Sequence, residues 1–399
     1  MKKIYIVTQF SSDFEGKGNN RFNYLSGLLQ RSGYDVELIT SDFSHVKKRK
    51  RTVDADKTPF RVTLLSEPGY PKNVCLRRFR SHHTFGKNLK AYLFSVEKPD
   101  LIYAAIPSLD VGSAVAEYCK KTGVPLIVDI QDLWPEAFKL VLKIPVVSDL
   151  IFAPMMHKAN KFYSAADKIV AVSETYKERG LRSCKKDKEG LCVYIGTDLA
   201  SFDANAESFP VEKPEDELWV AYVGTLGHSY NIEIIIDALN LIGDRLKQKV
   251  VFKVLGDGPY LERFKEYAKD CKVRVDFLGR LPYPEMTAYL KQADIAVNPI
   301  AKGAAQSIIN KHADYAAAGL PVVNTQECPE YRNLMTTYDC GINCDVEDAG
   351  AVGAALQILI TVPERRREMG ANSRRMAEER FNRPYTYQKI IAEIDKLTK

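Results

Sequence analysis

The chain has 399 residues, of which 45% are hydrophobic and 27% are charged, with a formal net charge of +6. This composition is that of an ordinary globular protein and excludes a disordered or low-complexity chain. The length exceeds what one hydrophobic core usually organises, so we expect two domains of roughly 150 to 200 residues each. No apolar run of about 18 residues occurs, and the amino-terminal apolar stretch is too short for a signal peptide. We therefore expect a cytosolic protein, or one that is peripheral on a membrane.

Metal and disulfide sites have little support. The eight cysteines are scattered, with no C-x-x-C pair and no histidine at the spacing of a zinc site, which predicts reduced thiols. Asp54 and Asp56 have the Asp-x-Asp spacing that metal-dependent transferases need, but they lie in a polar, basic loop without an apolar strand before it. We predict no catalytic metal and no cofactor.

The first half of the chain alternates apolar runs with helical patterns, which indicates parallel β-α-β units. A helix is expected at residues 21–31. Strands are expected at residues 4–8, 36–39, 101–105, 125–129, 168–172 and 192–195. These elements predict one doubly wound, Rossmann-like domain over residues 1–204.

The second half repeats this layout after a polar, acidic segment at residues 202–217, which is typical of an interdomain linker. Strands are expected at residues 219–223, 250–255, 273–278, 295–298 and 321–324, and helices at 231–244, from 284 and from 310. The fold class is therefore α/β, with a second Rossmann-like domain at residues 216–379 that faces the first across a cleft. The helical end of the chain is broken at Pro384, and its last part, residues 380–399, is expected to cross back to the first domain.

Two segments of the first domain combine positive charge with apolar surface. Residues 41–90 contain thirteen Lys or Arg against four Asp or Glu, including the run at residues 47–51. This run either faces the phosphates of a lipid, a nucleic acid or an anionic acceptor, or is a solvated loop. Residues 138–156 are strongly apolar with interspersed cations, and they form either core or a membrane-binding face.

Glycine pairs follow two of the expected strands. Gly16 and Gly18 lie between the first strand and the first helix, where backbone N–H groups and a helix N-terminus can receive an anion. Their spacing does not match the G-x-G-x-x-G fingerprint of a dinucleotide site, which argues against an oxidoreductase. Gly256 and Gly258 stand in a similar place, and for both pairs a plain turn is an equal interpretation.

The most informative stretch is residues 306–323. We predict a helix N-cap at Asn310, an acid one turn later at Asp314 and a helix stop at Gly319. A helix N-terminus can hold a diphosphate, and an acid on the next turn can accept the hydroxyls of a ribose. These are the requirements of a nucleotide-sugar site.

This stretch resembles the donor-binding motif of family 4 retaining glycosyltransferases of GT-B architecture. Gln306 and Asp314 stand where that motif has two Glu residues, so the resemblance implies a catalytic position with a donor-sugar contact for Gln306 and a ribose contact for Asp314. The intervening Ser307, Ile308 and Ile309 would line the donor site. Gly224, in the segment that resembles the opening of the family's second domain, would line it too.

The resemblance has departures. Thr225 and Tyr230 stand where many members have an Arg and a Lys that neutralise the diphosphate. Arg280 and Lys311 are the candidates to replace that pair. Because Lys311 lies three residues before Asp314, the two side chains could instead pair with each other.

In the first domain, residues 129–136 resemble the family's His-Asp-Leu-Trp-Pro segment. Gln131 stands where His is common, and Asp132 is retained. Asp132 and Glu136 are the candidates for the general base, with helix capping as the alternative for Asp132. Gln131 and Trp134 would shape the acceptor site.

The resemblance implies a hexosyl- or N-acetylhexosaminyl-transferase that moves a sugar from a UDP-sugar to an acceptor with retention, without nucleic acid as a partner. The expected acceptor is a polyprenyl-diphosphate-linked saccharide of bacterial surface polysaccharide synthesis, at the inner face of the plasma membrane. Three alternatives remain: a GT-B-fold epimerase or phosphorylase, an oxidoreductase, and a catalytically silent partner of another transferase.

Overall fold

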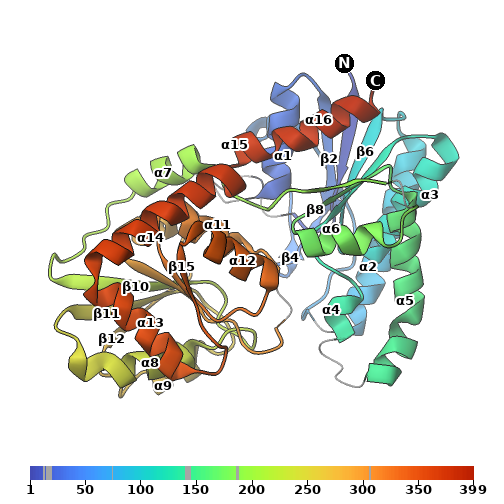
Figure 1. Ribbon diagram of the computed structural model, residues 1–399. Coiled ribbons are helices and arrows are strands. Elements are labelled where there is room, and N and C mark those ends of the chain that lie inside the picture. The colour runs from blue at the N-terminus through green and yellow to red at the C-terminus, as the bar shows by residue number, and fades with distance from the viewer. Residues whose placement is uncertain (12–13, 15–19, 74, 140–144, 186–187, 305–306) are drawn as a thin grey trace. The chain divides into compact units, whose positions relative to one another are not determined.

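The structure is a computed structural model that describes residues 1–399 except 12–13, 15–19, 74, 140–144, 186–187 and 305–306. The chain forms two compact units. The first unit comprises Met1–Tyr194 together with Tyr385–Lys399, and the second comprises Ile195–Pro384. Each unit is built on one parallel sheet (Figure 1).

The sheet of the first unit has seven strands in the order β5-β2-β1-β6-β7-β8-β9. Their bounds are β1 Lys3–Val7, β2 Asp35–Ser41, β5 Arg61–Leu65, β6 Leu101–Ile106, β7 Leu126–Ile130, β8 Lys168–Ala171 and β9 Gly190–Cys192. The central strands are buried on both faces, so they read as continuous apolar runs, as a parallel sheet requires. The strand order reverses between β1 and β6.

Helices cover both faces of this sheet (Figure 1). One face carries α2 (Leu76–Ser95), α3 (Leu109–Thr122) and α5 (Pro145–Ala165), and the other carries α1 (Arg21–Arg31) and α16 (Gln388–Leu397). Helix α1 begins where predicted because the side chain of Asn20 accepts the N–H groups of Phe22 and Asn23. The carboxyl-terminal helix is therefore part of the first unit's core.

The first unit also contains shorter elements in addition to the sheet and these helices. They are β3 Phe43–Ser44, β4 Arg49–Lys50, η1 Ala55–Lys57, α4 Glu136–Lys139 and α6 Glu174–Leu181. Strands β3 and β4 pair antiparallel, so the basic run at residues 47–51 closes a hairpin. Asp54 caps the exposed turn η1 through the N–H of Asp56, in keeping with a solvated loop there.

The sheet of the second unit has six parallel strands in the order β12-β11-β10-β13-β14-β15. Their bounds are β10 Glu217–Val223, β11 Lys249–Leu255, β12 Arg274–Gly279, β13 Ile295–Asn298, β14 Val322–Asn324 and β15 Gly341–Asn343. This is the doubly wound order in which the connection reverses between β10 and β13. The reversal places the loops after β10 and β13 at the point where ligands bind in such sheets.

The helices of the second unit are α7 Leu199–Glu207, α8 Ile232–Ile242, α9 Leu261–Tyr267, α10 Tyr283–Gln292, α11 Asn310–Ala317, α12 Pro329–Tyr338, α13 Ala349–Thr361 and α14 Pro363–Met376. Helices α8 and α13 pack into one apolar cluster with the sheet. Two short turns, η2 Gly243–Arg245 and η3 Ala377–Phe381, and α15 Arg383–Thr386 complete the chain.

The predicted linker is wrong over residues 202–207, because this part is helical. Asp198 caps α7 by accepting the N–H of Ser201, and Phe202 on α7 is fully buried. Because most residues of the predicted linker are polar, its sequence contains little sign that one aromatic side chain of the segment is buried. The two units divide at Tyr194 and Ile195, earlier than the predicted domain end at residue 204.

Two smaller expectations also differ. The N-cap of α11 is Ile309 and not Asn310, which is the first helical residue. The break near the end of the chain falls at η3 and Asn382, which has an extended backbone, so Pro384 lies inside α15. Gly319 ends α11 as predicted, with a positive φ of 72°.

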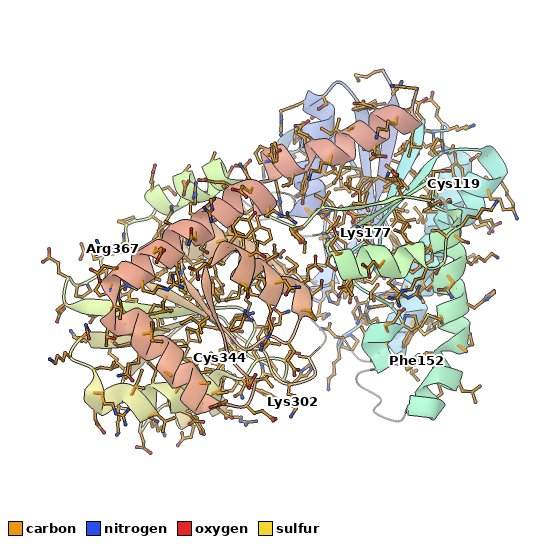
Figure 2. All side chains as sticks on the ribbon, in the orientation of Figure 1. Cys119, Phe152, Lys177, Lys302, Cys344 and Arg367 are labelled. Carbon is orange, nitrogen blue, oxygen red and sulfur yellow. The ribbon has the colours of Figure 1, made fainter. Side chains whose placement is uncertain are left out.

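None of the eight cysteines, all of which lie in described segments, forms a disulfide. Cys119 on α3 and Cys344 after β15 are among the buried thiols (Figure 2). Within the described ranges no cluster of His, Cys, Asp or Glu has the arrangement of a metal site. No described helix is both long enough and apolar enough to span a bilayer.

Candidate active site

Helix α11 is fixed at the point where the second sheet reverses its order. Strands β10 and β13 pair only through Val220 and Ala221 of β10 and then diverge. The Tyr315 hydroxyl of α11 bridges them by accepting the N–H of Val223 at 2.9 Å and donating to the C=O of Val297 at 3.2 Å. The N-terminus of α11 is therefore held beside the sheet edge where ligands bind.

Lys311, in the first turn of α11, is a buried cation without a hydrogen-bond partner. Its side chain is buried, and its Nζ atom makes no hydrogen bond. The ammonium lies 4.2 Å from the ring centroid of Tyr222 and 4.1 Å from that of Tyr230. Burial lowers the pKa of Lys311 well below its ordinary value. An anion bound here would offset the cost of the unpaired charge.

The alternative that Lys311 pairs with Asp314 is wrong. Asp314 is also buried, but its Oδ1 atom accepts a hydrogen bond from the hydroxyl of Tyr283 at 2.9 Å. The same hydroxyl lies 3.0 Å from Oγ1 of Thr197. Tyr283 thus fixes the carboxylate of Asp314, a contact that the sequence did not reveal.

The predicted donor-site glycines have a packing role. A Cβ at Gly256 would lie 1.8 Å from the carbonyl oxygen of Gly224, and one at Gly258 would lie 2.2 Å from that of Leu226. The loops after β10 and β11 are also joined by the N–H of Leu226 and the C=O of Asp257, at 3.0 Å. The plain-turn interpretation therefore accounts for Gly256 and Gly258 by itself. Gly224 has a φ of 147° and faces the ammonium of Lys311.

A buried network of amides supports the segment before α11. Asn298, at the end of β13, donates to Asn324 at the end of β14 and to Gln326. Gln326 in turn donates to the C=O of Ser307 at 3.0 Å. This network was not predicted from the sequence, although two of its members are polar residues that end buried strands, which is a signal the sequence contains.

His312 completes this support. It stacks on Tyr331 with ring centroids 3.6 Å apart, and its Nδ1 atom accepts the N–H of Ile309 at 3.3 Å. Burial lowers the pKa of His312 well below its ordinary value, so the ring is neutral and can accept this bond. Ile308, the residue before Ile309, is also buried.

The remaining residues predicted for the donor site are Gln306, Gly16, Gly18 and Arg280. Gln306, Gly16 and Gly18 lie outside the described residues. Arg280 is exposed and follows β12, which is the edge strand of the sheet. Of the two predicted cations, Lys311 is therefore the one that stands at the point of strand reversal.

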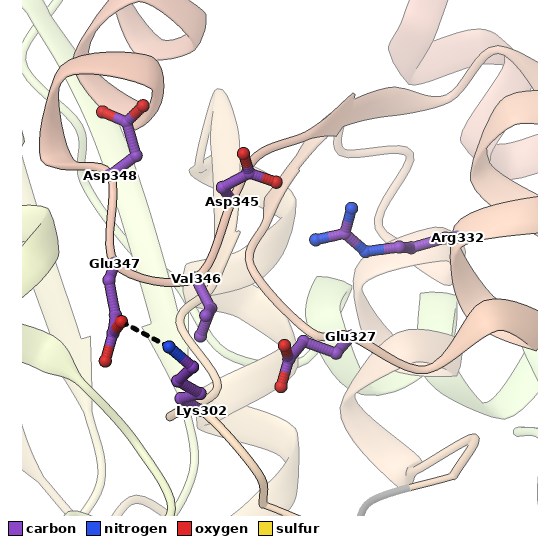
Figure 3. Close-up of a pocket in the computed structure, with 7 residues that line it drawn as sticks. All are labelled: Lys302, Glu327, Arg332, Asp345, Val346, Glu347 and Asp348. Carbon is purple, nitrogen blue, oxygen red and sulfur yellow. Dashed lines mark hydrogen bonds and ion pairs between the residues drawn. The ribbon is translucent and has the colours of Figure 1, made fainter.

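A separate pocket of about 560 Å³ opens beside the loops that follow β13, β14 and β15 (Figure 3). It is lined by Lys302, Glu327, Arg332, Asp345, Val346, Glu347 and Asp348. Lys302 is already paired with Glu347 at 2.8 Å. Four carboxylates against two cations do not suit a diphosphate, so we do not assign the donor to this pocket.

In the first unit, Asp129 at the end of β7 organises the edge of the sheet. It forms a buried ion pair with Arg21 at 2.9 Å and accepts the hydroxyl of Tyr103 at 2.7 Å. The side-chain amide of Gln131 also donates to Asp129, at 2.7 Å. The amide group of Gln131, predicted to contact the acceptor, is thus partly committed to the protein.

The carboxylate of Asp132 accepts two hydrogen bonds from its own loop. Its Oδ1 accepts the N–H of Leu133 at 2.9 Å, and its Oδ2 accepts the indole N–H of Trp134 at 3.2 Å. Burial raises the pKa of Asp132. The bonds it makes lie in the loop before α4 and do not cap a helix, contrary to the capping alternative.

Glu136 is placed differently. One of its carboxylate oxygens is paired with Nε of Arg179, which lies on α6. Because one oxygen of Glu136 is occupied by Arg179, whereas Asp132 accepts, among the described residues, only the N–H groups of Leu133 and Trp134, we keep Asp132 as the preferred candidate for the general base.

The basic run at residues 47–51 is partly structural. Lys50 pairs with Asp42 at 2.7 Å, and Arg51 donates to the C=O of Ser41 at 2.9 Å and to that of Ser11 at 2.8 Å. These bonds fix the β3–β4 hairpin, so only part of the run is available to a ligand.

Comparisons with known proteins agree with this architecture. Residues 19–199 match the family described as Glycosyltransferase Family 4, and residues 203–376 match Glycosyl transferases group 1. The chain belongs to glycosyltransferase family 4. A putative colanic acid biosynthesis glycosyl transferase of Escherichia coli is 20% identical over 67% of this glycosyltransferase and 68% of that protein.

Another relative is an uncharacterised glycosyltransferase of Methanocaldococcus jannaschii, which is 28% identical over 35% of this chain. The match spans only 36% of that protein's length. Among solved structures, the sucrose-phosphate synthase of Thermosynechococcus elongatus has a TM-score of 0.71 at 17% identity, covering 100% of this glycosyltransferase and 99% of that chain. Anabaena HepE in complex with UDP-glucose has a TM-score of 0.70 at 15% identity, covering 99% and 100%. These likenesses show the GT-B fold.

Proposed function

We propose that this enzyme transfers a sugar from a UDP-sugar to a lipid-linked saccharide with retention at the anomeric carbon, in the synthesis of a bacterial surface polysaccharide. The observation that carries the donor half is the buried, unpaired ammonium of Lys311 at the N-terminus of α11. The UDP and UDP-glucose complexes of HepE support the choice of nucleotide. The name of the Escherichia coli relative supports the pathway.

In this proposal the diphosphate binds to Lys311 and to the backbone N–H groups at the start of α11. The helix N-terminus and the cation act in the same direction on a negative ligand. They would stabilise the charge that develops on the leaving diphosphate. Lys311 thereby replaces the Arg and Lys of the family, whose positions are taken by Thr225 and Tyr230 in this chain.

Asp314 would accept the hydroxyls of the ribose, with Tyr283 holding it in place at 2.9 Å. Ser307, Ile308 and Ile309 would line the donor site through their backbone. We keep Gln306 as the contact to the donor sugar on the strength of the family resemblance alone.

Asp132 would take the proton of the acceptor hydroxyl. Its raised pKa makes it a better base than an exposed carboxylate. Trp134 fixes Asp132 through its indole N–H and offers its ring as a wall for the acceptor.

We further propose that the first unit docks on the membrane that carries the acceptor. Leu76 and Phe79 on α2, and Leu150 and Ile151 on α5, are exposed apolar side chains. Phe138 links the two helices, with ring centroids 6.1 Å from Phe79 and 6.0 Å from Phe152. The arginines in the first turn of α2 supply positive charge beside this surface, and apolar and basic groups act together on anionic lipid.

The test is a thermal-shift panel of nucleotide sugars followed by product analysis with a short-chain lipid-linked acceptor. We expect a UDP-sugar to raise the melting temperature, and NMR of the product to show the anomeric configuration of the donor. A product with an altered free UDP-sugar and no extended acceptor would instead indicate an epimerase. Failure of every nucleotide sugar to stabilise the protein would overturn the proposal.

A further inference from the structure

Two cations of the first unit share one aromatic ring. The ammonium of Lys48 lies 4.7 Å from the ring centroid of Tyr70, and the guanidinium of Arg78 lies 5.6 Å from it. Lys48 comes from the β3–β4 hairpin and Arg78 from the first turn of α2. Burial and the charge of Arg78 lower the pKa of Lys48, as expected for two like charges in partial burial.

Neither cation forms an ion pair among the residues that the structure describes. Both bind Asn73, which is neutral: Lys48 donates to its side-chain oxygen, and Arg78 donates to its C=O at 2.9 Å. Nearby Glu67 is occupied by the hydroxyls of Ser41 and Ser81 and by Gln9. Asp132 acts on Arg78 only at longer range. The positive charge is therefore not neutralised by the protein.

The start of α2 adds to this charge. The N-cap Cys75 makes no side-chain capping bond, and the first turn contains no acid. It contains Arg77 and Arg78 instead, and Arg80 follows it, although cations at a helix N-terminus are unfavourable. An arrangement that is costly in the free protein is relieved when an anion binds.

The floor beneath the two cations is aromatic and neutral. Arg78 also lies 4.7 Å from the ring centroid of Trp134, and Trp134 stacks on His82 with centroids 5.5 Å apart. Burial lowers the pKa of His82 to about 3, so this ring does not add charge at neutral pH. The hairpin residue Lys48 has a positive φ of 53°, a strained conformation for a non-glycine residue.

We propose that Lys48 and Arg78 form an anion subsite that holds a phosphate group of the acceptor over the rings of Tyr70 and Trp134. The inference rests on the proposed function, because it assigns the ligand to the acceptor side. Trp134 also donates to the carboxylate of Asp132, so a phosphate held here lies next to the proposed base. The subsite would align the acceptor and would not take part in bond making.

The two tryptophans of the chain allow a direct test. In a Trp219→Phe variant of the full chain, Trp134 is the only tryptophan, and its fluorescence reports ligands that reach Arg78. The probes are inorganic pyrophosphate and geranyl diphosphate. In this background Arg78→Gln and Lys48→Gln remove one cation each. Lys87→Gln removes an exposed cation of α2 that has no role in the subsite.

We expect pyrophosphate to change the Trp134 emission, with an affinity that falls about tenfold in Arg78→Gln and in Lys48→Gln and less than about twofold in Lys87→Gln. Tighter binding of geranyl diphosphate would identify a lipid-linked phosphate, and equal binding a free one. An unchanged affinity in both variants, or no response of Trp134 to either probe, would overturn the subsite. Stabilisation by UDP-sugar in the same samples would show that the donor proposal stands independently.

Discussion

The ammonium of Lys311 lies 4.2 Å from the ring centroid of Tyr222 and makes no hydrogen bond. A cation–π contact is worth up to about 2 kcal/mol when it is desolvated, which is less than the cost of removing an ammonium from water. The ligand-free enzyme therefore carries a destabilising charge where the diphosphate is expected.

Lys311→Met should raise the stability of the protein and weaken its binding of UDP. We expect the free energy of unfolding to rise by about 1 kcal/mol, because a buried charge is replaced by an apolar side chain of similar length. The affinity for UDP should fall by about tenfold or more, because a charge-assisted contact is lost. Urea unfolding and calorimetric titration measure the two effects. Lys302→Met, at an exposed lysine paired with Glu347, is the control and should leave UDP binding unchanged.

The same residue predicts a dependence of stability on pH. The pKa of Lys311 is lower in the folded protein than its ordinary value of 10.5, so the unfolded chain binds more protons between the two values. The free energy of unfolding should then rise with pH toward 10.5, by at most about 1.4 kcal/mol per pH unit. Buried Tyr222 has a raised pKa and acts oppositely above pH 10. The free energies of unfolding of the enzyme and of Lys311→Met should therefore be compared below about pH 9. The same dependence on pH in both proteins would refute a lowered pKa of Lys311.

Asp132→Asn should mainly lower kcat, whereas Glu136→Gln should mainly lower the stability of the fold. Asp132→Asn keeps an acceptor for the N–H of Leu133 and removes the base, so kcat should fall about 100-fold or more with UDP binding retained. Glu136→Gln removes the negative charge that pairs with Arg179, so it should lower the free energy of unfolding by about 1 kcal/mol with a smaller effect on kcat. Steady-state kinetics and urea unfolding of both variants distinguish them. A larger loss of kcat in Glu136→Gln would reverse the assignment.

The ribose contact can be isolated with a modified nucleotide. Asp314→Asn should lower the affinity for UDP by about tenfold, but it should have little effect on 2′-deoxy-UDP, which lacks one hydroxyl. Tyr283→Phe should give a smaller loss, because it frees the carboxylate without removing it. Tyr289→Phe on the same helix is the control. Equal losses for both nucleotides in Asp314→Asn would place the ribose elsewhere.

Leu150→Asp combined with Ile151→Asp should weaken membrane docking. Both side chains are exposed, so the fold should be retained, while burial of apolar area in the lipid is lost. Sedimentation with vesicles containing anionic lipid should show less bound enzyme, and UDP binding should be unchanged. Phe209→Asp, at an exposed apolar residue of the second unit, serves as the control. Undiminished sedimentation would count against this surface.

Much of the fold was accessible from the sequence because it follows from local patterns. The strands at β6, β10 and β13 are continuous apolar runs, and α1 begins after an Asn cap, so their positions were predicted to within a few residues. The stretch at residues 202–207 was misassigned because polar residues surround the single buried face around Phe202. A short amphipathic helix of that kind gives too weak a periodic signal.

The sequence by itself determined the family and the two parallel sheets, because these follow from motifs and from the period of apolar residues, and it named Lys311, Asp314 and Asp132 as candidate site residues. Only the tertiary structure decided what each side chain contacts. Lys311 faces Tyr222 rather than Asp314, and Glu136 is paired with Arg179. Such contacts join residues far apart in the chain, and the strand order that brings them together is set by long-range packing that no local pattern encodes.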